Sequence, residues 1–538
     1  MSGTGVHAAQ LILLLLLLFV AAFAALARKL ETPYPIVLVI AGSLLGLIPG
    51  IPKITLDPEL IFLVVLPPLL YAASWVTSWR DLSHNLVSIA MLAIGLVGFT
   101  VLSVALAGPW LFRGFDWRIG FVLGAAVATT DAIAATSIAK RIGLPKRIVD
   151  LLEGESLMND ATGLLALEFA TAMVVEGQTP TAGAGSLRLI YLTIGGVGIG
   201  LILGRIVEWF EHKIDDGPIE MAVSIMVPYA AYLTAEAIHV SGVLAVVAAG
   251  LYLGHKSSEF FSPGVRLQLR AVWGSLEFIL NGFVFVLIGL QLPFVLARVS
   301  ELSPRRLIFY GALFSTFLIL LRLCWTFPGA YVSYFIRTRL LRQHESRPGV
   351  RQIFVVGWTG MRGVIALAAA MSLPQTIADG SPFPHRDLIV FLTFSVILVT
   401  LVFQGLTLPP LIRILGLAEA PGPSCEEREA RRLVLEAALA RLEEVRQSDP
   451  SSPAEIYDDL AQHYKHRLAD LGGAGAQQDQ THAGHYFQYV DLSRMLLDVE
   501  RQAALRLRKE RRITDEVLRE IEHELDLSET RFVSVKSS

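Results

Sequence analysis

Long apolar runs, separated by short charged or Gly/Pro-rich segments, fill most of the chain up to Leu415. A helix that crosses a membrane needs about 20 mostly apolar residues. Dividing the runs at their charged and Gly/Pro-rich positions predicts an all-α membrane protein with about thirteen spans, at approximately 9–27, 35–50, 59–76, 85–112, 117–140, 148–176, 187–210, 219–238, 242–254, 270–296, 305–336, 352–373 and 387–415. The second and ninth are short, and short or interrupted spans often line transporter cavities.

The first apolar run, from about Leu11 to Ala27, fits either a first span or a cleaved signal peptide. A signal peptide carries its positive charges before the apolar segment. Here no Lys or Arg precedes the run, and Arg28 and Lys29 follow it directly. We therefore interpret it as a span, with the signal peptide as the alternative.

Lys and Arg are unevenly divided between alternate loops, and the richer set is expected on the cytoplasmic side. The richer loops hold Arg28-Lys29, Arg80, Lys140-Arg141, Lys146-Arg147, Lys213, Lys256, Arg266, Arg270, Arg337, Arg339, Arg342, Arg347 and Arg351. The poorer loops hold Lys53, Arg113, Arg118, Arg188, Arg298, Arg305-Arg306 and Arg386. This pattern predicts an external N-terminus and a cytoplasmic C-terminus, which requires an odd number of spans.

The composition supports a membrane protein and excludes several other classes. Hydrophobic residues make up 53% of the 538 residues and charged residues 17%, with a mean hydropathy of +0.56, outside the range of soluble globular proteins. The net charge of −3 gives no basic excess, so we expect no nucleic-acid partner. Cys324 and Cys425 are the only cysteines and are too few for a disulfide framework.

The chain becomes charged after the last span. We therefore predict a transmembrane domain over residues 1–417 and a cytosolic helical tail over residues 418–538. Leu435, Leu439 and Leu442 recur at the spacing of one helix face. The tail carries no enzyme motif, and we expect it to serve dimer contact or regulation.

Two predicted spans place polar residues beside positions where we expect the helix to be interrupted. The fifth carries Thr129, Thr130 and Asp131 near its centre, where a carboxylate costs about 2.5–3.5 kcal/mol on insertion scales. The twelfth carries Arg362 and Thr359 among three glycines, Gly357, Gly360 and Gly363, which favour local unwinding. The two spans run in opposite directions, as expected of an inverted repeat. If both break and cross, Asp131 would offset their N-terminal helix ends and Arg362 their C-terminal ends.

The sixth span has a strongly polar side. Ser156 and Asp160 are four residues apart, as are Glu155 and Asn159. A dehydrated alkali cation requires several oxygen ligands. Suitable ones are Asp160, Asp131, Thr130, Ser156 and the carbonyls near Thr129. Burial raises the pKa of a carboxylate, so protons and cations can compete for it, and competition at a site exposed alternately to each side is an exchange mechanism.

Each intramembrane charge also has a structural interpretation. Asp131 and Asp160 could join helices by buried hydrogen bonds. Arg362 and Glu155 are expected to satisfy each other as an ion pair. Glu277, Asn281 and Arg322 are expected to make polar contacts between helices.

The chain resembles the monovalent cation/proton antiporters, in particular the NhaP-like bacterial sodium/proton exchangers. The resemblance covers essentially all thirteen predicted spans. It is carried by LPPLLY at 66–71, ATTDA at 128–132, GESLMNDA at 154–161, AEAIHVSGVLA at 235–245, LEFILNGFVFVLIGLQL at 276–292 and GMRG at 360–363. The GES-x-x-ND string is the most specific of these motifs.

The resemblance implies an elevator-like exchanger in which a six-helix core carries the ion. Asp160 would be the carboxylate shared by ion and proton, with Asn159 supporting the site. The other ion-site residues would be Asp131, Ser156, Thr129 and Thr130. Glu155 would pair with Arg362. Asn159 stands where electrogenic relatives carry a second Asp, which implies electroneutral one-for-one exchange.

The resemblance further implies a homodimer in the bacterial inner membrane, with lipids around it and a role in pH homeostasis. Na⁺, Li⁺ or K⁺ and H⁺ would be substrates, and no cofactor is expected. The chain departs from some relatives at Ala72, where they carry an acidic residue on the third span. This departure weakens any role for an acidic group there and leaves the Asp160 cluster untouched.

Two other classes of membrane protein were considered. A cation channel or leak pathway could use the same charges, but the sequence shows no filter segment of carbonyls or acidic rings. An integral-membrane enzyme would need ligand or nucleophile spacing within the spans, and His-x-x-x-His and Gly-x-Ser-x-Gly are both absent there. Cation/proton exchange is therefore the favoured function, and the channel is its alternative.

Overall fold

The computed structural model describes residues 3–49, 56–177, 182–214, 216–299, 302–343, 347–418, 425–448, 454–471, 479–510, 512, 517–518, 521–522 and 524–529. These residues are helical or lie in turns and loops, apart from an isolated bridge between Thr376 and Pro382. The chain divides into two compact units, Met1–Glu419 and Ala420–Ser538.

The second unit contains three long charged helices. They are α21 (Cys425–Ser448), α22 (Ala454–Leu471) and α23 (Asp479–Lys509). α22 packs against both of the others, and Arg446 near the end of α21 pairs with Asp458 on α22 at 3.0 Å.

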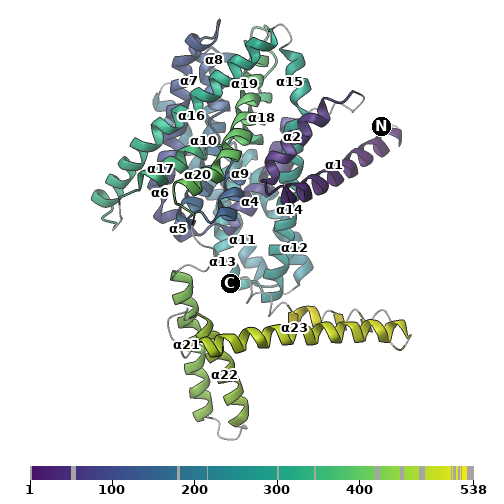
Figure 1. Ribbon diagram of the computed structural model, residues 1–538. Helices are drawn as coiled ribbons and strands as arrows, with labels where there is room; N and C mark the ends of the chain where they lie inside the picture. The colour runs from purple at the N-terminus through teal and green to yellow at the C-terminus, as the bar shows by residue number, and fades with distance from the viewer. Residues whose placement is uncertain are drawn as a thin grey trace. The chain divides into compact units, whose positions relative to one another are not determined.

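The first unit is a bundle of helices that vary in length and are joined by short loops (Figure 1). Several are interrupted by one π-helical turn, marked η. The elements are α1 (Gly3–Lys29), α2 (Tyr34–Gly46), α3 (Pro58–Leu60), η1 (Ile61–Val65), α4 (Leu66–Val76), α5 (Trp79–His84), α6 (Leu86–Ala90), η2 (Met91–Leu96), α7 (Val97–Leu111), α8 (Trp117–Ala126), α9 (Ala132–Ile142), α10 (Lys146–Val175), α11 (Ala182–Glu211), α12 (Gly217–Ala237), α13 (Gly242–Phe260), α14 (Pro263–Leu290), α15 (Leu292–Arg298), α16 (Pro304–Phe335), η3 (Ile336–Leu340), α17 (Val350–Trp358), α18 (Val364–Met371), α19 (Arg386–Val399), η4 (Thr400–Gln404) and α20 (Gly405–Ile414).

Each predicted span coincides with one or more of these helices. Six helical segments among the described residues are long and apolar enough to cross a membrane, and α2 and α8 are shorter apolar helices. The count of thirteen spans and the inverted repeat remain predictions. The ninth span was predicted to be short, but α13 continues to Phe260. The last turns of α13 are polar, so the helix extends beyond the apolar segment that the sequence predicted as a span.

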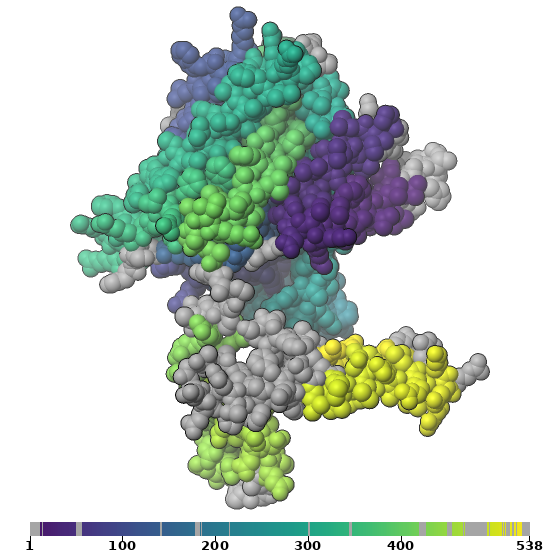
Figure 2. All heavy atoms as spheres, in the orientation of Figure 1, coloured from purple at the N-terminus to yellow at the C-terminus, as the bar shows by residue number. Residues whose placement is uncertain are grey.

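The first unit has two hydrophobic clusters. The larger one joins α7 to α10 with the second half of α14 and with α16 to α20. The smaller one joins α4, α12, α13 and the first half of α14. α10 contributes to both, with Leu152 in the larger cluster and Leu157 in the smaller. α1 and α2 pack against each other and against α14, and in Figure 2 their purple side chains form one exposed edge of the unit.

Both predicted helix interruptions are present, and they meet. α8 ends at Ala126 and α9 begins at Ala132, while α17 ends at Trp358 and α18 begins at Val364. The backbone N–H of Asp131 donates to the carbonyl of Met361 at 2.8 Å. Interrupted backbone is tolerated at membrane depth only when its polar groups find partners inside the protein. A hydrogen bond between the two interruptions provides one such partner.

Glycines in the second interruption allow close packing at the crossing. A Cβ atom at Gly363 would overlap the carboxylate of Asp131, and one at Gly360 would overlap the side chain of Arg322. These glycines therefore leave room for the charged groups of neighbouring segments, in addition to weakening the helix as the sequence suggested.

Gly363→Ala tests the close approach at the crossing. The added methyl would displace the Asp131 carboxylate, and such overpacking typically costs about 1–3 kcal/mol. We expect a lower unfolding temperature in detergent. The control is Gly98→Ala on α7, where an added Cβ meets nothing within 4 Å. It should be neutral or slightly stabilising, and equal losses in the two variants would contradict the packing argument.

Candidate ion-binding site

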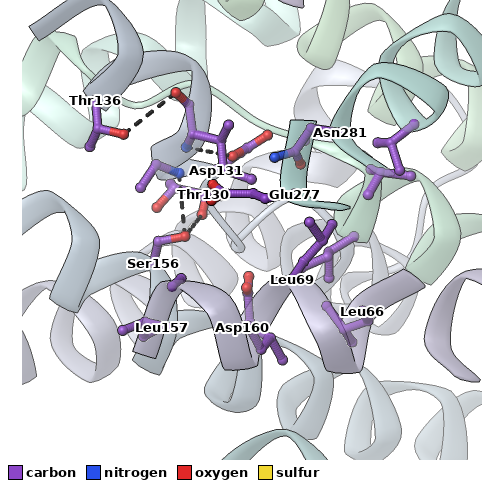
Figure 3. Close-up of a pocket in the computed structure, with 18 of the residues that line it drawn as sticks. Leu66, Leu69, Thr130, Asp131, Thr136, Ser156, Leu157, Asp160, Glu277 and Asn281 are labelled. Atoms are coloured by element: carbon purple, nitrogen blue, oxygen red, sulfur yellow. Dashed lines mark hydrogen bonds between the residues drawn. The ribbon is translucent and has the colours of Figure 1, made fainter. Parts of the chain in front are cut away.

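A cavity of about 300 Å³ lies beside the two crossing interruptions. Its walls come from η1, α4, the start of α9, α10, α14 and the start of α18. The polar residues that Figure 3 labels along this wall are Thr130, Asp131, Thr136, Ser156, Asp160, Glu277 and Asn281. Most of the remaining wall is aliphatic, as with Leu66 and Leu69. The site is therefore a mainly apolar cavity with its polar groups gathered at the helix breaks.

Ser156 on α10 forms hydrogen bonds with the backbone of the first interruption. Its hydroxyl donates to the carbonyl of Thr130 at 2.9 Å and accepts from the backbone N–H of Ala132 at 3.3 Å. The same hydroxyl thus satisfies one backbone acceptor and one backbone donor that the interruption leaves outside a helix. The carbonyl of Thr130, which the sequence suggested as a cation ligand, already has a hydrogen-bond donor.

Glu155 pairs with Arg322, and this corrects the predicted pair of Glu155 and Arg362. Nη1 and Nη2 of Arg322 donate to the two carboxylate oxygens of Glu155 at 2.6 and 2.8 Å. Both side chains are about 1% exposed. Such a bidentate ion pair stabilises a guanidinium and a carboxylate that are both buried away from water. Arg322 therefore makes an interhelical contact, as predicted, and its partner is the carboxylate that had been assigned to Arg362.

Arg362 binds backbone carbonyls. Its Nε donates to the carbonyl of Val127, the C-cap residue directly after α8, at 3.1 Å, and its Nη1 donates to the carbonyl of Gly360. A cation is favourable at the negative end of a helix. The predicted placement of Arg362 at a C-terminal helix end is thus confirmed. Arg322 does the same for α17 by donating to the carbonyl of Val356 at 3.2 Å.

Asp131 caps the start of α9. Its Oδ1 accepts from the backbone N–H of Ile133 at 2.8 Å, the usual role of an Asp at an N-cap. Its carboxylate also lies against Gly363, which directly precedes α18. Asp131 is thus beside the N-terminal ends of both half-helices, where a negative charge is favourable. This is the position that the sequence predicted.

Thr130 links the ion pair to Asn159. Its hydroxyl donates to Oε1 of Glu155 at 3.0 Å and accepts from the amide of Asn159. Arg322, Glu155, Thr130 and Asn159 consequently form one continuous chain of hydrogen bonds. Asn159 is 1% exposed and is held behind the cavity wall by this chain.

Three buried oxygens near the crossing have no hydrogen-bond partner among the described residues. They are Oδ1 of Asp160, Oδ1 of Asn159 and Oγ1 of Thr129. Asp160 is 3% exposed and, in Figure 3, points from α10 toward the polar group around Ser156. A buried acceptor without a donor is unfavourable and calls for an explanation, such as a bound ion or water. These oxygens are the positions at which a cation or a proton would be stabilising.

The cavity also contains polar residues to which the sequence assigned no site role. Glu277 and Asn281 on α14 were expected to make interhelical contacts, and both face the cavity together with Tyr34 and Glu153. Their four-residue spacing placed Glu277 and Asn281 on one helix face, which was the available signal. The sequence could not show that this face borders the same cavity as Asp160.

Of the predicted ion-site residues, five line the cavity: Thr129, Thr130, Asp131, Ser156 and Asp160. Asn159 supports the wall through Thr130. No cluster of three or more His, Cys, Asp or Glu residues suited to a metal ion occurs in the described part of the chain. The donors are carboxylate, hydroxyl and carbonyl oxygens, which are ligands for a hard cation.

Comparisons with known proteins agree with this geometry. The sequence profile of the transmembrane sodium/hydrogen exchanger family matches residues 14–414. An uncharacterised Na⁺/H⁺ exchanger of Mycobacterium tuberculosis is 34% identical over 519 residues, which are 94% of this chain and 93% of the relative. A sodium, potassium, lithium and rubidium/H⁺ antiporter of Bacillus pumilus is 34% identical over 422 residues, which are 77% of this chain and 62% of the relative.

The fold resembles that of a solved structure. The sodium proton antiporter MjNhaP1 of Methanocaldococcus jannaschii at pH 8 superposes with a TM-score of 0.59 and 19% sequence identity. The match covers 77% of this chain and 100% of that one.

The buried pair of Arg322 and Glu155 can be tested by a double-mutant cycle. Arg322→Met should destabilise the protein by about 3–5 kcal/mol, because it leaves Glu155 as an uncompensated buried charge. Adding Glu155→Gln should recover part of that loss. Thermal unfolding in detergent is measured for Arg322→Met, for Glu155→Gln and for the double variant. The exposed pair of Arg298 and Asp387, at 3.2 Å, is the control and should contribute at most about 1 kcal/mol. Simple additivity for Arg322 and Glu155 would show that they do not interact.

Proposed function

Because this chain belongs to the sodium/hydrogen exchanger family of monovalent cation/proton antiporters, we propose that it exchanges Na⁺, Li⁺ or K⁺ for H⁺ at Asp160. It is a transporter, a multi-pass protein of the plasma membrane, and the family match gives no support to the alternative of a cation channel. The observation that carries the proposal is the unpartnered Oδ1 of Asp160 in the cavity beside two broken helices.

The surrounding hydrogen bonds support Asp160 as the carboxylate that binds a proton and a cation in turn. Oδ1 of Asp131 caps α9, and both oxygens of Glu155 bind Arg322. Asp160 has no such cation or cap among the described residues. A carboxylate away from water is unfavourable unless a positive charge neutralises it. Asp160 would therefore hold either a proton or a cation, and the two would exclude each other.

The local charges support one-for-one exchange. Two N-terminal helix ends lie beside Asp131, two C-terminal helix ends receive Arg362 and Arg322, and Glu155 offsets Arg322. Asn159, beside Asp160, carries no charge. Of the three carboxylates at the helix crossing, Asp160 is thus left to alternate between one proton and one monovalent cation, which would make the exchange electroneutral.

Around the ion, Asp160 would supply the charged ligand. The hydroxyl of Thr129 makes no hydrogen bond to any residue that the structure describes and would act as a second ligand. Asp131, Thr130 and Ser156 complete the polar wall, although their hydrogen bonds at the interruption give them a positioning role as well. Asn159 would hold Thr130 in place.

The choice of cation follows from the relatives. The Bacillus pumilus relative is named for exchange of sodium, potassium, lithium and rubidium. Hydroxyl and carboxylate ligands in a cavity of about 300 Å³ leave room for ions that keep part of their water. We therefore include Na⁺, Li⁺ and K⁺ as substrates.

The cavity supports alternating access. From Asp160 it extends to Val76, Ser137 and Glu153, which adjoin the Lys- and Arg-rich loops on the predicted cytoplasmic side. The structure would then correspond to an inward-facing state. The two hydrophobic clusters suggest the moving parts of an elevator, because α10 carries Asp160 along their boundary.

Further parts of the proposal rest on family membership. We assign the protein to the inner membrane of a bacterium, as a homodimer surrounded by lipid, with the N-terminus outside and the tail in the cytoplasm. Its contribution to the cell would be pH homeostasis. The second unit would support dimer contact or regulation.

Asp160→Asn should abolish exchange, because the amide can neither release a proton nor neutralise a cation. The measurement uses proteoliposomes with an internal pH dye, Na⁺, Li⁺ or K⁺ pulses, and a valinomycin clamp. Wild-type protein should move protons against each transported cation at a rate that does not change when the voltage is clamped. Asp379→Asn, on an exposed loop, is the control and should retain wild-type rates. Full exchange by Asp160→Asn would remove Asp160 from the mechanism, and cation flux without proton movement would indicate a channel.

Cross-linking tests movement of α10 relative to α11, whose Ile199, Leu203 and Val207 pack against the smaller hydrophobic cluster. Glu168 on α10 and Arg188 on α11 approach to 3.6 Å. In a protein without Cys324 and Cys425, Glu168→Cys with Arg188→Cys should lose exchange on treatment with a reducible cross-linker and regain it on reduction. The control pair is Gly311→Cys with Ser395→Cys, both in helices of the larger cluster, where a Cβ at Gly311 lies 3.1 Å from that of Ser395. Unchanged exchange across the linked α10–α11 pair would exclude the elevator movement.

A further inference from the structure

A second cavity, of about 250 Å³, lies between α6, α10, α16, η3 and α17. It shares no lining residue with the Asp160 cavity. Three arginines line it, namely Arg147, Arg337 and Arg347. No Asp or Glu is among the described residues that line it. The described lining therefore carries three guanidinium groups and no carboxylate, unlike the lining of the ion site.

Arg337 is the most enclosed of these arginines. It is 2% exposed, and its Nε donates to Oε1 of Gln343 at 2.8 Å while its Nη1 lies 3.5 Å from Oγ of Ser88. Arg147 and Arg347 are exposed and stand at the rim. Asp81 binds Lys146, the first residue of α10, at 3.3 Å and does not line the cavity.

Two helix N-termini open on the same cavity. α10 begins at Lys146 and α17 at Val350, and neither has a side-chain cap. Residues of both first turns line the cavity, including Ile148 and Gln352. Backbone N–H groups and the positive end of the dipole make a helix N-terminus favourable for an anion. Here both ends act on a cavity that already holds three guanidinium groups.

We propose that this cavity binds the phosphate group of a phosphate ester. Guanidinium groups bind phosphate oxygens through paired hydrogen bonds, and Ser88 and Gln352 add further donors. The deeper wall is apolar, with Leu92, Ile148 and Val356, and suits the carbon part of an ester better than a hydrated inorganic ion. The source is either the headgroup of an anionic lipid or a soluble organophosphate, which share this chemistry.

The position of the cavity gives the ligand a way to affect the core. Val356 lines the cavity, and its carbonyl accepts from Arg322, the partner of Glu155. A phosphate would thus bridge the starts of α10 and α17 and the end of α16, the three helices that carry this ion pair and its carbonyl partner. The three arginines belong to the loops predicted to be cytoplasmic, where lipid headgroups and soluble organophosphates are both available. The inference does not depend on exchange at Asp160.

Binding can be measured on the delipidated full-length protein in neutral detergent at constant ionic strength. The probes are dioctanoyl phosphatidylglycerol, glycerol 3-phosphate and, as a phosphate-free control, dioctanoylglycerol. The readout is the unfolding temperature from tryptophan fluorescence. We expect a saturable rise with at least one phosphate probe and no rise with dioctanoylglycerol. A response to the lipid alone assigns the source to the membrane, and a response to glycerol 3-phosphate assigns it to soluble esters.

Variants test whether the arginines form the site. Arg147→Gln with Arg347→Gln changes only exposed side chains and should weaken binding at least about tenfold, and Arg337→Gln should do the same. The matched control is Arg339→Gln, an exposed arginine on η3 that does not line the cavity. The proposal is overturned if neither phosphate probe binds saturably, if dioctanoylglycerol stabilises equally, or if the Arg147/Arg347 variant binds as tightly as Arg339→Gln.

Discussion

The structure of the membrane unit depends on satisfying backbone groups where two helices stop within the apolar layer. A continuous helix pairs its own N–H and C=O groups, whereas each interruption leaves several without partners. In this protein those partners come from other segments. The N–H of Asp131 binds the carbonyl of Met361, Ser156 bridges both sides of the first break, and Arg362 and Arg322 reach the carbonyls that end α8 and α17. Most polar residues around the cavity therefore stabilise the interrupted backbone. The buried oxygens that take no part in these hydrogen bonds define the candidate site.

This constraint separates residues of the same chemical type into different roles. Asp131, Glu155 and Asp160 are all carboxylates near the same crossing. Asp131 caps the start of a helix and Glu155 binds a guanidinium, while one oxygen of Asp160 has no partner in the described part of the chain. Position relative to helix ends, rather than residue type, thus distinguishes a fixed charge from one that is available to a ligand.

Much of this could be predicted from the sequence, because the signals were local. Apolar runs gave the helices, and the Thr-Thr-Asp and glycine-rich strings gave the two breaks and the positions of Asp131 and Arg362 at helix ends. The partner of Glu155 was assigned wrongly because two arginines were available and spacing along one helix says nothing about its neighbours. The contribution of α14 to the cavity was missed for the same reason. The polar last turns of α13 lie outside the predicted apolar span, because hydropathy identifies the apolar part of a helix and not its end. Contacts between distant segments are set by packing, which a single sequence does not show.

The ion pair between Glu155 and Arg322 joins residues that are 167 positions apart in the chain. Helices enter the bilayer in the order of their synthesis, so α10 is made well before α16 exists. Until then Glu155 sits in a nascent chain without its guanidinium, and an unpaired carboxylate at the centre of a span disfavours insertion by about 2.5–3.5 kcal/mol. Stable burial of Glu155 therefore requires α16, which carries Arg322. The pair thus makes the burial of one helix depend on a segment that is translated much later, and a chain ending before α16 would leave Glu155 without its guanidinium.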